Sequence, residues 1–413
     1  MAPTSKRNKT VNTYIDYSEL EFNSGEAFSK IKGKLDIPKK FALFDPNIEL
    51  GHSIKFNLKE DKLDNIVDTI SFVENIIINK ADIYKIPVFC KVTDKEYIDL
   101  LYSKLIKCAT EDELNVAFSE FDIIGTTEIF NNTDYKFTLK RGQNEMSVDN
   151  ITFDDFKKFA QNCELDLASA FEKVNIISYY MSNSVKTDKL INIIDYMDED
   201  ERCVLSRGKW YHFNDDYLEY LKSSLAEIDV IYNPEFDFSS SIHDDYINSR
   251  YLEYKDSADY IGLSKSKAKQ KLMRKFYAER TFNLIRERDN GFKNYDRIEQ
   301  RYGTSSIELM DLYKDKTMFA VKIGKASAHL CYVVDQSLSS LKMYQHKTLT
   351  HMPEIDTVCI WIILDRGELP ILEDGVPNIN ELDMLLLKNK IDGWKKEVRL
   401  AGLKPIIYIN YRK

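Results

Sequence analysis

The end of the chain alternates strand-like and helix-like segments in an order that few folds accommodate. Residues Ser305 to Ser340 predict two short strands joined by a charged turn and followed by a helix. TVCIWIIL at 357–364 then predicts a buried strand, NINELDMLLLKNKIDGWKKEVRLAGL a helix, and KPIIYINY a terminal strand. This β-β-α-β-α-β order predicts a C-terminal α/β domain.

The first half of the chain mixes both element types without such an order. VNTYIDY at 11–17 predicts a strand, SGEAFSKIKGKL at 24–35 a capped helix, and TFDDFKKFAQNCELDLASAFEK at 152–173 a helical stretch. YNPEFDFSSS at 232–241 contains Pro and Ser and has no clear period, which places a soft boundary there. We therefore expect an N-terminal α+β region over 1–240 and a C-terminal α/β region over 241–413.

Composition excludes several classes of protein. No apolar run reaches the roughly 18 residues of a membrane span, so we expect none. The histidines and cysteines show no pattern typical of zinc sites. Scattered cysteines without a CxxC pair favour buried, reduced thiols and a cytoplasmic location; they are Cys90, Cys108, Cys163, Cys203, Cys331 and Cys359.

Five polar residues stand among the apolar ones of the predicted strand-strand-helix unit, and their types suit phosphodiester cleavage. Such chemistry uses carboxylates to hold hard cations such as Mg²⁺, and a lysine to activate water or to steady the phosphate charge. We expect Asp311 and Glu308 to bind the metal and Lys322 to serve the phosphate or the attacking water. The full candidate catalytic set is Glu308, Asp311, Lys322, Ser327 and Gln336.

The order of these residues resembles the core of PD-(D/E)XK nucleases. Those enzymes carry an Asp on one strand, a (D/E)xK triplet on the next and, in some branches, a Gln-x-x-x-Tyr element on the following helix. Here Asp311 precedes Lys322, and Gln336 follows with Ser340 at the position of the Tyr. Ala320 occupies the first triplet position, so the second carboxylate is absent unless Glu308 replaces it. The resemblance implies a restriction-endonuclease-like fold for the C-terminal region.

The pairing register of the two strands decides whether these side chains meet. If the turn centres on Asp315, Glu308 lies opposite Lys322 and Asp311 points to the other face. A bulge or a later turn brings Asp311 towards Lys322 instead. A purely structural alternative also stays open, in which Glu308 and Lys322 form a cross-strand ion pair on a solvated face.

A strongly basic stretch lies directly upstream of this unit. Between Lys255 and Arg301, Lys and Arg outnumber Asp and Glu almost two to one, although the whole chain carries a net charge of −9. Such a stripe can follow a phosphate backbone, with Phe276, Tyr277 and Phe282 stacking on bases. The alternative is a solvated helix face whose aromatic residues belong to the core. The candidate nucleic-acid-binding residues are Lys265, Lys267, Lys269, Lys271, Arg274, Lys275 and Arg280.

Several short elements follow one another in the order found in one protein family. They begin with Gly208-Lys209-Trp210-Tyr211, which by itself predicts a tight hairpin with packed rings. The later ones are Tyr295-Asp296-Arg297, Ser305-Ser306-Ile307-Glu308, Asp311-Leu312, Val321-Lys322, Ser327, Leu330, Gln336 and Ser340. The chain thus resembles a bacterial family of unknown function described as "sporadically distributed protein". Ala320 and Tyr332 replace two histidines of that family.

The resemblance implies a role in phage defence or genome conflict. We therefore expect a nucleic-acid-interacting protein of bacterial antiphage defence, with DNA or RNA as its partner and Mg²⁺-dependent cleavage as its catalytic activity. The alternative is a non-catalytic module that recognises nucleic acid or a phage protein and signals to a protein partner. Convergence of Glu308, Asp311 and Lys322 in one small cleft would discriminate between the two.

Overall fold

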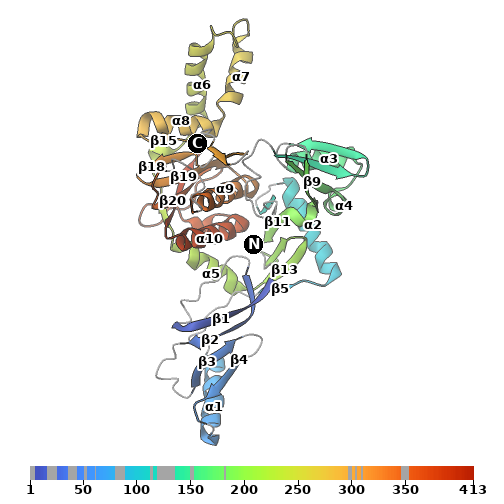
Figure 1. The fold of residues 1–413 in the computed structure, drawn as a ribbon, viewed down its shortest axis with the longest axis vertical. Helices are drawn as coiled ribbons and strands as arrows, with labels where there is room; N and C mark the ends of the chain where they lie inside the picture. Colours follow the sequence, from blue (N-terminus) through green and yellow to red (C-terminus); the bar gives the residue numbers. More distant parts are fainter. Residues whose placement is uncertain are drawn as a thin grey trace.

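The structure is a computed structural model, and it describes most of the chain (Figure 1). The described residues are 5–15, 26–35, 44–50, 54–60, 62–79, 89–111, 115–118, 135–148, 153–180, 183–295, 300–302, 305–307, 310–345 and 353–413. They form a mixed α and β fold with several separate sheets, as predicted. No helix within these ranges is both long and apolar enough to cross a membrane.

The N-terminal sheet and its helix form one end of the molecule. The sheet has the order β1 (Ser5–Ile15), β2 (Glu26–Leu35), β3 (Phe44–Leu50) and β4 (Ile54–Leu58), and α1 (Leu63–Asn79) follows. β1 and β2 are parallel, and the other neighbours are antiparallel. The helix predicted over 24–35 is therefore wrong. Lysines alternate with Ile31, Gly33 and Leu35 there, a period of two that favours a strand.

The middle of the chain builds two further sheets around one core. One sheet has the order β10-β9-β7-β8, and the other has the order β5-β13-β12-β11-β6. The helices α2, α3 and α4 pack on this core. The bounds are β5 (Phe89–Lys91), α2 (Lys95–Glu111), β6 (Val116–Phe118), β7 (Tyr135–Arg141), β8 (Asn144–Val148), α3 (Phe153–Asn162), α4 (Leu167–Lys173), β9 (Asn175–Tyr180), β10 (Asn183–Lys189), β11 (Ile194–Asp198), β12 (Cys203–Ser206) and β13 (Lys209–Phe213).

The predicted hairpin at Gly208 joins β12 to β13. Arg207 and Gly208 both have left-handed backbone angles, with φ of 48° and 69°. A Cβ at Gly208 would approach the side-chain oxygen of Asn192, and the left-handed backbone also favours glycine there. Trp210 is buried and meets Tyr102 and Tyr196 edge-to-face, which confirms the packed rings.

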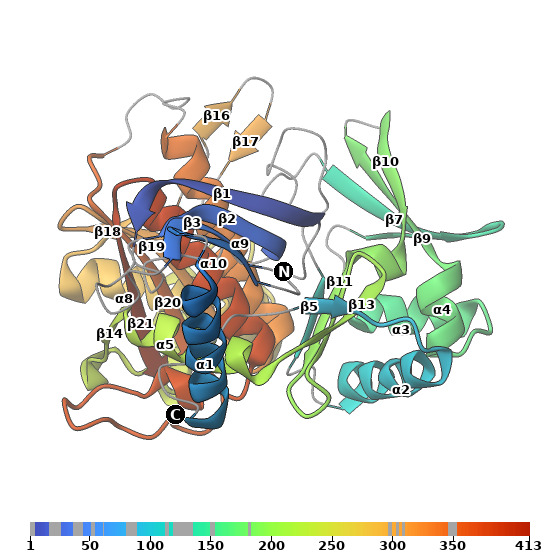
Figure 2. The same cartoon turned by 90° about the horizontal axis from the view of Figure 1, so that it is seen from below.

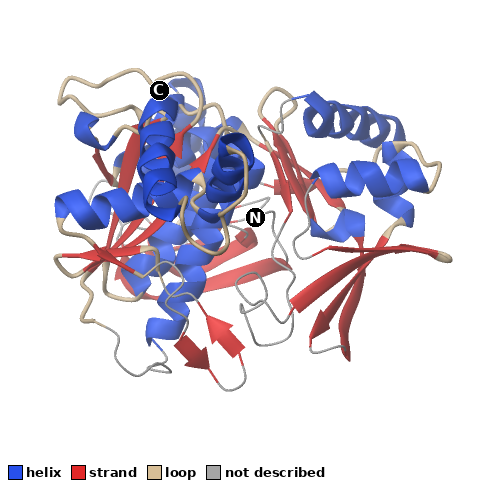
Figure 3. Ribbon diagram, turned by 90° about the horizontal axis from the view of Figure 1, so that it is seen from above, coloured by secondary structure: helices blue, strands red, loops and turns tan. Residues whose placement is uncertain are grey.

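The C-terminal part is a three-layer α/β unit around a sheet of order β14-β21-β20-β19-β18-β15. β19, β20, β21 and β14 are parallel neighbours, whereas β18 is antiparallel to β19 and to β15. Figure 3 shows helices on both sides of the sheet. The strand bounds are β14 (Asp229–Ile231), β15 (Lys293–Asn294), β18 (Leu312–Lys314), β19 (Thr317–Gly324), β20 (Thr357–Leu364) and β21 (Lys404–Tyr411), and β16 (Gln300–Tyr302) pairs separately with β17 (Ser305–Ile307).

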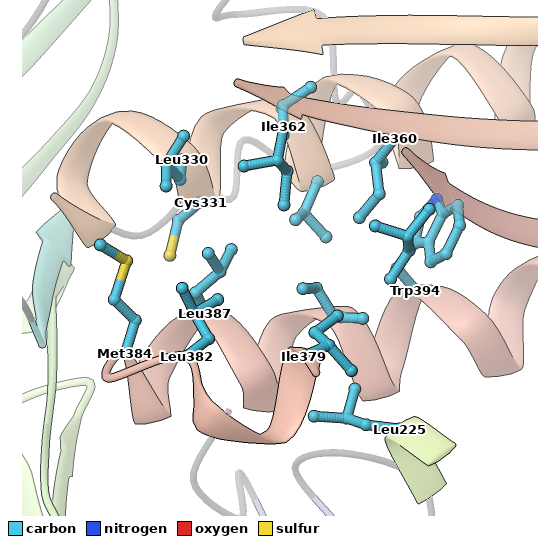
Figure 4. Packing of buried hydrophobic residues seen from close by; sticks show 14 of the residues in the cluster. Leu225, Leu330, Cys331, Ile360, Ile362, Ile379, Leu382, Met384, Leu387 and Trp394 are labelled. Carbon is cyan, nitrogen blue, oxygen red and sulfur yellow. The ribbon is translucent and has the colours of Figure 1, made fainter. Parts of the chain in front are cut away.

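Alternate residues of the central strands point into two cores. Ile360 and Ile362 meet α9 (Ser327–Gln345), α10 (Leu385–Leu400) and α5 (Asp215–Ala226), as Figure 4 shows for part of this cluster. Cys359, Trp361 and Ile363 face α6 (Ser240–Tyr254), α7 (Lys265–Lys275) and α8 (Ala278–Asn290). The predicted β-β-α-β-α-β order is confirmed as β18-β19-α9-β20-α10-β21.

One strand pairs across the expected domain boundary. β14 precedes the expected boundary at residue 241 and yet pairs with β21 of the C-terminal sheet.

All six cysteines are free thiols. Burial holds for Cys163, Cys203, Cys331 and Cys359, but Cys90 is exposed because it lies on β5, at the edge of its sheet.

Helices α6 and α7 form an antiparallel arm that projects from the C-terminal unit (Figure 1). The capping residues Ser239 and Ser264 accept hydrogen bonds from the N–H groups of Ile242 and Lys267, which starts each helix. Ala268 and Leu272 are the buried residues of α7. Its remaining positions therefore face solvent, and we call this projection the α6–α7 arm.

Candidate active site and nucleic-acid interface

Lys322 lies on β19 with its side chain directed towards α9. Its Nζ is 3.2 Å from Oε2 of Glu279 and 5.0 Å from the ring centroid of Tyr332. Both charged side chains of the pair are largely shielded from solvent. The lysine is thus held in one orientation by an ion pair on one side and an aromatic face on the other.

Asp311 lies where the hairpin between β18 and β19 opens. Its Oδ2 accepts a hydrogen bond from the Val321 N–H at 2.7 Å. Its own N–H donates to the Phe319 carbonyl at 3.0 Å, and its carbonyl accepts from the Tyr295 N–H. The buried carboxylate of Asp311 therefore accepts the hydrogen bond of the Val321 amide, which in a regular sheet would go to a neighbouring strand. Val321 directly precedes Lys322.

The turn of the hairpin settles the register that the sequence left open. Asp315 and Lys316 both have positive φ, and Lys314 pairs with Thr317. Leu312 consequently lies opposite Phe319, after which regular pairing stops. The turn therefore lies half a residue later than a turn centred on Asp315, and the Asp311 side chain accepts from the Val321 amide.

Glu279 is the residue that the sequence reasoning missed. It lies in the first turn of α8, and its Oε2 also accepts from the Ile323 N–H at 3.4 Å. Val321 and Ile323 are two positions apart on one strand, so the two carboxylates lie about 7 Å apart along its edge. An acidic residue in a first helical turn is a common stabilising feature. No signal in the sequence distinguished Glu279 from such a residue.

The other predicted catalytic residues have different settings. Ser327 is fully buried at the start of α9, and Gln336 is buried one turn beyond Tyr332 on the same helix. The carbonyl of Gln336 accepts a hydrogen bond from the Ser340 hydroxyl at 3.0 Å. Glu308 lies outside the described residues.

The carboxylates at this edge of β19 can be compared with what a Mg²⁺ ion needs. Within the described ranges, no three His, Cys, Asp or Glu side chains lie close enough together to hold a metal ion. Mg²⁺ often takes only one or two protein carboxylates and fills its remaining positions with water and phosphate oxygens. A carboxylate that accepts one hydrogen bond keeps lone pairs for a cation. Because the oxygen ligands of Mg²⁺ lie roughly 2.0–2.1 Å from the ion, Asp311 and Glu279 at about 7 Å apart do not fit one ion together. The described residues alone therefore do not form the expected Mg²⁺ site.

The basic residues of α7 are displayed on the α6–α7 arm. This helix carries Lys or Arg at more than half of its positions and no acidic residue. Lys265, Lys267, Lys271, Arg274 and Lys275 are exposed, and Lys269 is half-exposed. Across the described part of the chain, no carboxylate forms an ion pair with any of the six. A shallow depression beside them is lined by Lys265, Ser266, Lys269, Gln270 and Met273.

Aromatic residues of the arm stabilise these cations from below. The Nζ of Lys271 lies 4.8 Å from the Tyr260 ring, and that of Lys275 lies 4.6 Å from the Tyr254 ring. The expectation that Phe276 and Phe282 stack on bases is wrong, because both are buried in the core beneath the arm. Tyr277 is exposed.

The basic surface continues towards the Lys322 edge. α8 begins three residues after α7 ends, and a guanidinium nitrogen of Arg280 donates to the Lys275 carbonyl at 3.0 Å. Arg280 is therefore next to Glu279, the ion-pair partner of Lys322. The arm and the candidate active site share the junction between α7 and α8.

A second group of lysines, on α10, was also missed by sequence reasoning. Lys388, Lys390, Lys395 and Lys396 lie within the fold rather than on its surface. Nζ of Lys390 is 2.6 Å from Asp335, and that of Lys396 is 2.9 Å from Asp392. Nζ of Lys395 is 2.6 Å from the Ser224 hydroxyl and 3.0 Å from Glu227, and Lys388 donates to the Asn380 carbonyl.

The buried environment of Lys390 shifts several pKa values. Burial alone would lower the pKa of Lys390, but Asp335, Cys331 and Asp195 together raise it above its ordinary value. Burial raises the pKa of Asp195, with Lys390 opposing the shift, and raises the pKa of the Cys331 thiol to about 12. The cluster joins β11 of the middle sheet to α9 and α10.

Comparison with known proteins yields one match. No curated protein and no solved structure matches the chain. A family model described as DUF6119, a family of unknown function, matches residues 2–354. Since this match covers most of the 413 residues, the chain belongs to the DUF6119 family.

Proposed function

We propose that the chain binds nucleic acid, DNA or RNA, through α7. The observation that carries this proposal is the exposed row of cations on the α6–α7 arm, which lacks ion-pair partners among the described carboxylates. An acidic protein that keeps such a concentration of positive charge on one projecting helix gains little stability from it. Phosphate backbones are the partners that such surfaces bind, with release of counterions.

Charge reversal on one face of α7 tests the proposal. Lys267→Glu, Lys271→Glu and Arg274→Glu alter residues at helical spacing. The measurement is fluorescence anisotropy of labelled single- and double-stranded DNA and RNA at several salt concentrations. We expect at least about tenfold weaker binding and a salt dependence reduced by about three phosphate contacts.

A matched control separates the face of α7 from overall charge. Lys91→Glu, Lys95→Glu and Lys107→Glu change the net charge equally at exposed positions of β5 and α2. This variant should bind as the wild type does. Equal loss in both variants, or no binding by the wild type, would contradict the proposal.

Metal-dependent cleavage of the bound nucleic acid is a second candidate function. The observation that favours it is that Lys322 pairs with Glu279, and that Glu279 and Asp311 both accept hydrogen bonds from amides of β19 next to Lys322. Lys322 would then steady the charge of the phosphate, and Asp311 and Glu308, as expected from the sequence, would hold a Mg²⁺ ion that would polarise a water or phosphate oxygen. A restriction-endonuclease-like core for the C-terminal unit belongs to this candidate, as does a role for Gln336 in orienting the site.

Cleavage assays with Mg²⁺ or Mn²⁺ separate the two candidates. Lys322→Ala and Glu279→Gln should each abolish cleavage while leaving binding within a few-fold of the wild type. Lys316→Ala, at the exposed hairpin turn, is the control for a lysine lost nearby. Binding without cleavage by the wild type would leave a non-catalytic nucleic-acid-binding module.

The cellular setting that we propose is cytoplasmic antiphage defence in bacteria, with a protein partner that receives a signal. This part rests on the family resemblance described above and on no contact in the structure. Plaque counts on cells with the wild type, the α7 variant or Lys322→Ala test it. Protection that survives both variants would favour an adaptor that acts through protein contacts alone.

A further inference from the structure

Helix α1 presents a continuous apolar stripe to solvent. Leu63, Ile66, Val67, Ile70 and Val73 are between 41% and 76% exposed. Their spacing of three and four residues places them on one face of the helix. Contiguous apolar patches of more than a few hundred Å² are uncommon on monomers and mark interaction sites.

The opposite face of α1 is the one turned towards the rest of the fold. Asn65, Thr69 and Phe72 are its half-buried residues. The Thr69 hydroxyl donates to the Asn65 carbonyl at 2.6 Å, within the helix itself. A helix that belonged to a monomer alone would turn its aliphatic stripe inwards. Among the described side chains, α1 instead turns Asn65 and Thr69 inwards beside Phe72, and five aliphatic ones outwards.

The charges of α1 restrict what can cover this stripe. Asp64, Asp68 and Glu74 are acidic, and the helix contains no Lys or Arg. Membrane-surface helices carry basic residues on their polar face, and an acidic helix is repelled by anionic lipid and by nucleic acid. The occupant is therefore a protein surface that is itself apolar.

The spacing of the stripe suits a second copy of the same helix. Leu63, Ile66, Ile70 and Val73 repeat at intervals of three, four and three residues, which is the seam of a two-helix coiled coil. In this register Asp64 and Asp68 lie away from the seam and Glu74 borders it, so the seam positions themselves carry no charge. The same stripe would supply both halves of a two-fold interface.

The position of α1 leaves room for such a partner. Figure 1 shows α1 at the end of the molecule opposite the α6–α7 arm, and Figure 2 shows α1 in front when the molecule is seen from below. Covering the stripe on both copies would bury on the order of 1,000 Å², the lower limit for a specific dimer. We infer that the chain forms a homodimer through α1, with an affinity weak enough to make dimerisation depend on concentration. This inference does not depend on the proposed function.

Sedimentation velocity of the full chain at several concentrations tests the inference. The seam variant Ile66→Lys with Ile70→Lys should weaken the dimer at least about tenfold. Ile261→Lys, which alters an equally exposed isoleucine on the α6–α7 arm, should leave it intact. A wild type that is monomeric throughout, or a dimer that the seam variant retains, overturns the inference.

Crosslinking provides a second measurement that does not rely on added charge. Ile70→Cys, in a Cys90→Ser background that removes the exposed natural thiol, should form dimers with a bifunctional maleimide. Asp68→Cys in the same background places the thiol on the flank and should form fewer. Equal crosslinking from both positions also overturns the inference. Circular dichroism and urea midpoints equal to those of the wild type establish that each variant is folded.

Discussion

Helices α7 and α10 are both rich in lysine, yet they use it in opposite ways. On α7 the cations face solvent, and several lie over tyrosine rings of the arm. On α10 the ammonium groups of Lys390 and Lys396 are buried against Asp335 and Asp392. The difference lies in the neighbours, because Asp335 and Glu227 from other segments pair with lysines of α10, whereas on the arm Lys271 donates to the Asp259 carbonyl.

This contrast shows what lysine density can and cannot indicate. A buried ammonium needs a partner, since an unpaired charge inside a protein costs several kcal/mol. An exposed cation needs none and remains available for an external anion. The lysines of α7 are therefore the candidates for binding an external partner, whereas those of α10 join α10 to α5 and α9.

The largest effect should follow from removing the buried ammonium of Lys390. Lys390→Met leaves Asp335 and Asp195 without their counter-charge, so the free energy of unfolding should fall by about 3–5 kcal/mol. Urea denaturation measures the loss, with Lys271→Met on α7 as the control. A loss below about 1 kcal/mol would mean that the cluster is less buried than the structure shows.

A smaller effect is expected at Ser224, which links two charged side chains of α10. Its hydroxyl donates to Asp392 and accepts from Lys395. Ser224→Ala removes both bonds and should lower the free energy of unfolding by about 1–3 kcal/mol. Thermal or urea unfolding measures the change. If Ser224→Ala were neutral, the polar network between α5 and α10 would contribute nothing to stability.

The buried Asp195 should make the free energy of unfolding depend on pH. Burial raises its folded-state pKa above the ordinary value, so the folded protein holds this proton more tightly than the unfolded chain. As pH rises above about 4, the unfolded state releases the proton first, and the free energy of unfolding falls until pH passes the folded pKa. Asp195→Asn cannot lose this proton. Its stability should therefore decline less than that of the wild type between pH 4 and 8 in urea titrations, and parallel curves would refute the raised pKa.

The smallest effect on stability should come from α7. Charge reversal at Lys267, Lys271 and Arg274 breaks no described ion pair, so the free energy of unfolding should change by less than about 0.5 kcal/mol per site. The same variant is expected to lose nucleic-acid binding. A marked loss of stability would show that the arm depends on these cations, and would make the binding result ambiguous.

The sequence predicted the parts of the fold whose patterns are local. The C-terminal strand and helix order, the hairpin at Gly208 and the basic helix all follow from periodicity and turn residues. The strand at 26–35 was mistaken for a helix because Ser24 and Glu26 imitate a cap, although alternation was present. Glu279 and the α10 lysines could not be identified, since their roles depend on partners far away in the sequence.

The carboxylates at the open edge of β19 also bear on self-association. Beyond Phe319, the strand no longer pairs with β18, and its outward amides could template an extended segment of another molecule. Asp311 and Glu279 occupy the amides of Val321 and Ile323 and surround them with negative charge. Removing both carboxylates would expose a pairing edge in the middle of an apolar sheet. By this argument, the two side chains would oppose the addition of a strand at this edge.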